Sequence, residues 1–326
     1  MATLVGTSTI NSPSGRGKDA LGIILQNSAF LRALEKYSGW ELDATSYLFA
    51  PVTATSTAPA RALGSAFSDG TRTFPSNQSG TLAVHGDSVT TDISYLQDAA
   101  RGLRDKDTTL NKDIQRRLIA FSKAYEALLF TGSGADSNIK GLRTILDGTT
   151  TIPGFTSTYR YKSATDVAGS ADSLDLSTSA NQKKFLELLK TQKLDVENAT
   201  MVAMNSSLWA RVETAAFDLR LARETTDQFG QDVVKFAGME LVIVGDTAIT
   251  LTEDDTASTP VAETTSCYIM APAEMNLSLV TNSGLYWMDW DHQDNTQKGR
   301  ETWEIRSQWK IENAKAIKRI AHIKVG

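Results

Sequence analysis

One stretch of the sequence, Leu110 to Phe130, constrains the fold more than any other. Its apolar residues recur every three or four positions, which places them on one face of an α-helix. At about 1.5 Å per residue the helix is a rod of roughly 30 Å, well beyond the usual length of about 11 to 12 residues. Asp107 to Thr109 offer oxygens that can cap its start, and Gly132 and Gly134 can end it. Lys and Arg occupy the other faces, so we expect the rod to lie across a sheet with one side in water.

The composition narrows the class of protein. A chain of 326 residues favours about two domains, and its 41% hydrophobic residues are typical of a soluble globular protein. No apolar run approaches the roughly 20 residues that span a bilayer, and residues 1–18 lack a secretory signal, so we expect no membrane partner. Cys267 is the single cysteine, which excludes an internal disulfide framework. The net charge of −5 argues against a dedicated nucleic-acid binder.

The N-terminal part begins with few large apolar residues that could form a core. Residues 1–26 begin with small and polar side chains and favour an extended arm. Ser28 can cap a short helix that carries Phe30 and Tyr37.

The next segment, Pro51 to Thr90, consists largely of Ala, Ser, Thr, Gly and Pro and cannot bury itself. Weak alternation at 71–74 and 81–84, with Pro75 to Gly80 between, predicts a long projecting hairpin. Such a hairpin is stable only against another surface, for example a neighbouring subunit.

The C-terminal half predicts helices mixed with strands, without a βαβ pattern or an internal repeat. The clearest strand runs from Trp303 to Ile311, where apolar and polar residues alternate. We expect helices over 179–192 and after Asn205, and further strands at 200–204, 233–236, 239–244, 266–271, 275–280, 285–290 and 317–325. The predicted fold class is therefore α+β.

Candidate chemistry is sparse. Gly132 to Gly134 with Lys140 lacks the spacing of a phosphate loop and lies at the wrong end of a helix. The densest cluster of potential metal ligands spans Asp289 to Asp294 and contains Asp289, Asp291, His292 and Asp294. Neighbouring strand residues point to opposite faces, which favours a solvated acidic loop, although a metal-dependent enzyme remains an open alternative. The three histidines and many serines include no GxSxG motif, so nothing singles out a nucleophile.

A basic group surrounds the start of the long helix. Arg101 and Arg104 precede it, and Arg116 and Arg117 lie on it. They form either an ordinary charged face, balanced by nearby Asp residues, or a contact with a polyanion or a neighbouring subunit.

The order of these elements resembles the major capsid proteins of tailed double-stranded DNA phages with the Hong Kong 97 fold. The resemblance covers nearly the whole chain and rests on order and spacing, because its motifs are short. They are FTGSG at 130–134, NIKGL at 138–142, MVAMN at 201–205, FAGM at 236–239 and WKIENAKAI at 309–317.

The resemblance implies a division of the chain into named parts. Residues 1–46 are an N-arm, and 47–95 are an E-loop, a long hairpin that reaches over a neighbour. A peripheral domain contains the long helix, called the spine, within 96–140, and its return strands lie within 285–326. Residues 141–284 form an axial domain.

The resemblance also implies a function. Subunits form pentamers and hexamers that close into an icosahedral shell around phage DNA, with no enzymatic activity and no cofactor. Such a protein is part of the virion, is assembled in the host cytoplasm, and meets a portal, a possible decoration protein and, non-specifically, the packaged DNA. A shell subunit of the encapsulin type, which loads protein cargo, is the alternative within this fold. The expected contacts between subunits are Phe30, Tyr37, Phe67, Phe74, His85, Arg101, Arg104, Arg116 and Arg117.

Two departures from the family pattern lead to further expectations. Some relatives join an E-loop lysine to an asparagine through an isopeptide bond, but residues 47–95 contain no lysine. We therefore expect no such crosslink, although Asn295 and Asn313 are available. The chain also leaves no room for a long N-terminal scaffolding segment, and Met1 favours a separate scaffolding protein.

Overall fold

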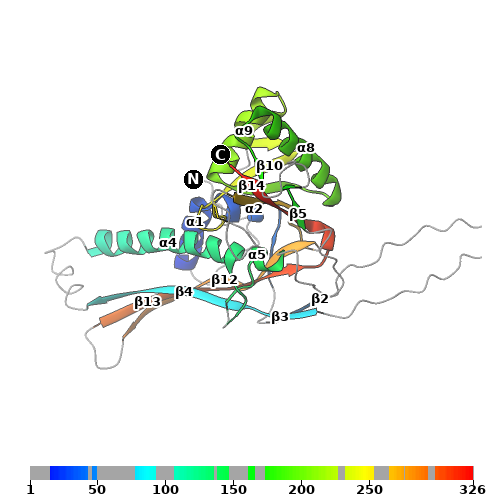
Figure 1. The fold of residues 1–326 in the computed structure, drawn as a ribbon. Helices are drawn as coiled ribbons and strands as arrows, with labels where there is room; N and C mark the ends of the chain where they lie inside the picture. The colour runs from blue at the N-terminus through cyan, green and yellow to red at the C-terminus, as the bar shows by residue number, and fades with distance from the viewer. Residues whose placement is uncertain are drawn as a thin grey trace, which may run out of the picture.

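Two β-sheets and a long helix between them organise the chain in the computed structural model (Figure 1). The structure describes residues 15–42, 46–49, 78–92, 106–135, 138–146, 161–165, 173–226, 232–252, 264–274, 276–292 and 298–325. Helices and strands are mixed without a repeating βαβ order, which confirms the predicted α+β class.

The long helix is α4, Lys106–Thr131, and it confirms the prediction made from the spacing of apolar residues. It begins four residues before Leu110, so the residues expected to cap it, Asp107 to Thr109, lie in its first turn. It ends where the chain turns back closely on itself: a Cβ atom at Gly132 would come within 2.1 Å of the Ile139 carbonyl oxygen. Only glycine fits there, and Gly134 has a positive φ of 74°.

The first sheet lies under α4 (Figure 1). Its strand order is β1 (Trp40–Leu42), β12 (Leu277–His292), β13 (Lys298–Ile311) and β4 (Ala83–Asp92), with β1 parallel to β12 and the other pairs antiparallel. As predicted, alternate residues of β13 from Trp303 to Ile311 are buried. The Tyr125 hydroxyl is 2.6 Å from the Ser307 hydroxyl, and the Trp309 indole N–H donates to the Leu129 carbonyl at 2.9 Å. The helix is therefore bonded to the sheet as well as packed on it.

The predicted strands at 275–280 and 285–290 are parts of one strand, β12. Its pairing with β13 shifts register between Thr281 and Leu285, where Gly284 has a positive φ of 69°. An irregularity of this kind bends a strand without ending it. The gap between the two predicted strands, 281–284, coincides with this irregularity.

The second sheet has eight strands, in the order β5-β14-β11-β7-β10-β9-β8, with β6 beside β14. Strand β14, which lies within 285–326, pairs with β11 and so belongs to this sheet, whereas β13 belongs to the first. The strands are β5 (Tyr161–Ser163), β6 (Leu174–Asp175), β7 (Met201–Asn205), β8 (Ala222–Thr226), β9 (Asp232–Phe236), β10 (Met239–Val244), β11 (Thr264–Met270) and β14 (Ile317–Lys324).

The central strands of the second sheet are buried on both faces. In β7, Val202 and Met204 join the core under helices α8 (Ser179–Asp195) and α9 (Ser206–Asp218), whereas Met201 and Ala203 face the core shared with α4. A strand covered on both faces is expected to be continuously apolar, as this one is. Asn205 caps α9, as predicted, by accepting from the Leu208 N–H.

Within the expected arm, residues 15–26 are helical and not extended, whereas residues 1–14 lie outside the described residues. Residues 15–27 form helix α1 (Gly15–Asn27), whose Leu21, Ile24 and Leu25 are buried in the core shared with α4. Helix α2 (Ala29–Lys36) follows, capped by Ser28 as predicted. The first residues of α1 are small and polar, and its apolar face begins only in its second half. The sequence pattern at the start of α1 therefore did not indicate a helix.

Where a projecting hairpin was predicted, the structure describes a strand pair with other bounds than those predicted. Strand β2 (Ser46–Phe49) pairs antiparallel with β3 (Gln78–Thr81), so Gly80 lies in a strand and not in a turn. The expected strand at 71–74 lies outside the described residues. Two short elements, α5 (Leu142–Ile145) and a 3₁₀ turn at Ala314–Ala316, complete the fold.

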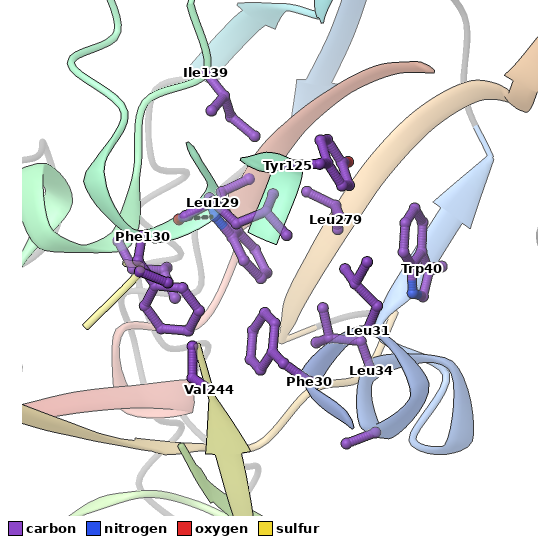
Figure 2. Packing of buried hydrophobic residues seen from close by; sticks show 14 of the residues in the cluster. Phe30, Leu31, Leu34, Trp40, Tyr125, Leu129, Phe130, Ile139, Val244 and Leu279 are labelled. Carbon is purple, nitrogen blue, oxygen red and sulfur yellow. Dashed lines mark hydrogen bonds between the residues drawn. The ribbon is translucent and has the colours of Figure 1, made fainter. Parts of the chain in front are cut away.

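Substitution of Phe30 tests this core. Its ring lies 4.8 Å from that of Phe130 (Figure 2). The ring of Trp309 lies 6.4 Å from it. Truncating a buried Phe to Ala costs about 3 to 5 kcal/mol of unfolding free energy, because transfer energy is lost and a cavity remains. We expect F30A to lower the urea midpoint of dissociated subunits by a corresponding amount. The control L194A alters a side chain that is 84% exposed and should stay within about 0.5 kcal/mol. Equal midpoints for the two variants would contradict this packing.

Candidate assembly surfaces and the junction between the sheets

A buried carboxylate joins the spine helix to two other elements. Glu126 of α4 is 5% exposed. The Ser28 hydroxyl, at the start of α2, donates to one of its oxygens, and the Gly245 N–H, just after β10, donates to the other at 2.6 Å. Burial raises the pKa of Glu126, although these two hydrogen bonds and Lys123 oppose the shift. This single side chain therefore links α2, α4 and the second sheet.

A second buried carboxylate holds the other end of α2. Glu240 of β10 accepts from the Lys36 ammonium at 2.6 Å and from the Tyr37 hydroxyl at 2.8 Å. Burial, together with the hydrogen bond and charge of Glu240, raises the pKa of Tyr37. Helix α2 is thus bonded to β10 near its end and, near its start, is connected through Glu126 to the loop after β10.

Three of the predicted contact residues form contacts within the chain itself. Phe30 has 0% exposure, so the prediction that it contacts another subunit is corrected: its ring is part of the chain's own core. Tyr37 is bonded to Glu240. His85 is 8% exposed, and its ring lies 6.0 Å from that of Tyr125. Burial lowers the pKa of His85, which favours a neutral ring under α4.

The basic residues of the spine differ in their surroundings. The Arg116 side chain is 80% exposed and lies 3.8 Å from Asp113 on the same helix. Arg117 donates to the Ser88 carbonyl at 3.0 Å and lies 3.6 Å from Asp87, so it fastens α4 to β4. Arg116 is therefore paired within its own helix, whereas Arg117 connects two elements. The other expected contacts, Phe67, Phe74, Arg101 and Arg104, lie outside the described residues.

Two exposed apolar surfaces were missed by sequence reasoning. The first is on the outer face of the first sheet, where Val84, Tyr286 and Met288 are between 42% and 49% exposed. Tyr286 pairs in register with Glu304, and Val84 with Arg306, so these side chains lie on the face opposite α4. The signal in the sequence was a strand with apolar residues at consecutive positions, Leu285 to Met288.

The second surface is at the end of α9. Phe217, Leu219 and Leu221 are between 37% and 39% exposed. Arg220, between Leu219 and Leu221, has a positive φ of 55°, which turns the chain sharply after α9. Exposed large apolar side chains near one helix end are candidates for contacts with other molecules.

The candidate metal cluster is only partly visible. Asp289, Asp291 and His292 lie on β12 with side chains outside the described set, and Asp294 lies outside it altogether. Over the described residues, no group of three or more potential ligands gathers around one point. None of the helices in the same ranges is both long and apolar enough to cross a bilayer.

Asn313, one of the two asparagines considered for an isopeptide bond, is engaged within the chain. Its amide N–H donates to Glu197 at 3.1 Å, and Lys315 lies 3.2 Å from the other oxygen of that carboxylate. The hydrogen bonds from Asn313 and Lys315 lower the pKa of Glu197. Asn295 lies outside the described residues, so the expectation of no crosslink stays a prediction.

Replacing Glu126 by Gln tests the buried carboxylate. A carboxyl whose pKa is raised by folding stabilises the fold below its ordinary value of 4.5, and this contribution is lost as the pH rises through the folded pKa. Gln stays neutral, so E126Q should gain unfolding free energy relative to the unsubstituted chain as the pH rises from about 5 to about 8. Urea denaturation at several pH values measures the difference. The control E187Q removes an exposed carboxylate of α8 and is measured at the same pH values. A constant difference for E126Q would mean that Glu126 keeps its ordinary pKa.

Comparisons with known proteins identify the fold. No protein-family model matches the sequence, and neither does any curated protein. The capsid of cyanophage A-1(L) matches with a TM-score of 0.61 and 11% identity, over 91% of this chain and 93% of that chain. The capsid of an empty GTA particle matches with a TM-score of 0.57 and 16% identity over 89% of each chain. An encapsulin complex from Synechococcus elongatus matches with a TM-score of 0.55 and 10% identity, over 88% and 85%.

At such low identities a structural match establishes the fold and nothing finer. The matches extend over most of both chains, and so include both sheets and the spine helix. The chain therefore has the Hong Kong 97 fold, which phage capsid proteins share with encapsulins, as its resemblance to the family implied.

Proposed function

We propose that this protein is the major capsid subunit of a tailed double-stranded DNA phage and that its pentamers and hexamers close into an icosahedral shell. The observation that carries the proposal is the fold, which matches capsid subunits over about nine-tenths of each chain. A shell subunit acts through its surfaces, so we assign no catalytic residue and no cofactor. The protein would belong to the virion and be assembled in the host cytoplasm.

The architecture supports a division into the parts that the family implies. We assign the first sheet and α4 to the peripheral domain, and the second sheet with α8 and α9 to the axial domain. The E-loop would consist of β2, β3 and the residues that connect them. On this division α1 and α2 belong to the body of the subunit, since their apolar faces lie in its core.

The exposed surfaces are the proposed contacts between subunits. The outer face of the first sheet, with Tyr286 and Met288, and the end of α9, with Phe217, would lose contact with water on assembly, which favours association. Arg116 would add a salt-sensitive contact from the spine. Contacts through Phe67, Phe74, Arg101 and Arg104 remain part of the proposal.

Other partners follow from the proposed role. The net charge of −5 suits a container that touches packaged DNA non-specifically and releases it. We include a portal, a separate scaffolding protein and a possible decoration protein among the proposed partners.

Shortening the E-loop tests whether this segment makes the shell. Phe49 pairs with Gln78, so the ends of the connection lie side by side and a short linker can join them. We expect that replacing residues 51–76 with a Gly-Ser linker leaves a folded subunit, with the circular dichroism spectrum of the full chain, but prevents closed shells. Electron microscopy of the purified protein measures the outcome.

A matched control removes a loop of a different kind. Residues 253–263 connect Thr252 to Thr264, which form a β-bridge, so the same linker can replace them. This variant should still form shells. Closed shells from the E-loop variant, or their loss in both variants, would count against the proposed role of the E-loop.

The encapsulin match supports a second candidate, a nanocompartment that encloses protein cargo. The contents of the particles separate the two functions, because a phage head holds nucleic acid. Particles isolated from cells that produce them naturally should contain nuclease-protected double-stranded DNA. Particles that contain a co-purifying protein and no DNA would favour the nanocompartment and contradict the phage assignment.

A further inference from the structure

A groove opens in the second sheet where the hairpin β9–β10 separates. The two strands pair in register at two positions only, Phe236 with Met239 and Lys235 with Glu240. Strand β9 stays paired with β8 over five positions, so these two strands leave β10 together. The space bordered by β10, the β8–β9 pair, α2 and α9 has a volume of about 280 Å³. It is separate from the apolar surfaces proposed as subunit contacts.

Strand β10 turns backbone groups toward this groove. The Glu240 N–H donates to the Thr200 carbonyl at 2.9 Å on the β7 side, so residues on either side of Glu240 direct their backbone groups toward β9. The Leu241 carbonyl accepts from the Trp209 indole N–H at 3.3 Å. Ile243, two residues later, has no register partner in β9 and is 40% exposed. The groove therefore contains a short free strand edge.

The side chains around the groove combine an apolar floor with an acidic rim. The apolar lining, here called the floor, includes Ala29, Ala33, Val233 and Ile243. The rim carries Glu213, Glu224 and Asp232. Arg32 faces them, whereas the charge of Lys36 is balanced by Glu240 at 2.6 Å.

Two of the rim carboxylates repel each other. Burial and the nearby charge of Glu224 raise the pKa of Glu213. Among the described residues, neither of these carboxylates forms an ion pair. A cation placed between them would relieve the repulsion, because opposite charges a few ångströms apart in a partly buried site attract strongly.

We propose that this groove binds a short extended segment of another protein, in which Lys or Arg alternates with small or β-branched apolar residues. The segment would extend the free edge at Ile243, place its apolar side chains on the floor and its cations on the rim. A segment of this chain with the same pattern, Ile317–Lys324, is already built into the second sheet as β14 and cannot enter the groove. The three carboxylates of the rim favour a basic segment of a partner protein as the occupant. The proposal concerns the subunit itself and does not depend on the function proposed above.

Binding of a labelled synthetic peptide, Lys-Val-Arg-Val-Lys-Val-Arg, tests the charge requirement. Fluorescence anisotropy with the full-length protein should show saturable binding that weakens as salt is added. Replacing both rim glutamates, in E213Q/E224Q, should weaken binding by about fivefold or more, as expected for the loss of two partly exposed ion pairs. The control E187Q/E274Q removes two exposed carboxylates elsewhere and should bind like the unsubstituted protein.

Backbone methylation of the peptide tests strand addition without any change to the protein. A peptide N-methylated along one edge should lose binding, and one methylated along the other edge should keep it, because only one edge meets Ile243. Equal binding by E213Q/E224Q, or equal binding by both methylated peptides, would overturn the proposal. Binding to dissociated subunits but not to assembled particles would also overturn it, because a second copy of the chain would then occupy the groove.

Discussion

The rest of the structure depends on the packing of α4 between the two sheets. On one side, Tyr125 and the Leu129 carbonyl are bonded to the first sheet through Ser307 and Trp309. On the other, Phe130 lies 5.2 Å from the ring of Tyr268, and Glu126 is bonded to Gly245 next to β10. Large aromatic and aliphatic groups packed on both sides of one rod bury much apolar area, so neither sheet can move without disturbing the helix.

This arrangement explains where the fold tolerates buried charge. Glu126 and Glu240 are each satisfied by two donors, and in each case α2 supplies at least one of them. A buried carboxylate without such partners would cost several kcal/mol. Helix α2 is therefore a structural part of the junction. Among the described residues, the outer sheet face, the end of α9 and the groove beside β10 are surfaces that we propose for contacts with other molecules.

Several elements could be predicted because their patterns are local. The spacing of three and four residues in α4, the alternation along β13 and the Ala237-Gly238 turn between β9 and β10 each express a period or a backbone preference within one segment. Other features could not be predicted. The sequence around Phe30 does not distinguish a side chain in the chain's own core from one that contacts a neighbour. The groove exists only because β9 and β10 separate after two paired positions, which no local pattern indicates.

The sequence by itself determined the α+β class, the long helix and, through the order of its short motifs, the resemblance to the Hong Kong 97 fold. Only the tertiary structure decided that α1 and α2 pack into the body, that β12 is one strand and that β14 joins the second sheet. The physical reason is that periodicity and turn preference act between residues a few positions apart. The sheet that a strand joins is set by contacts between distant segments, which no single stretch of sequence contains.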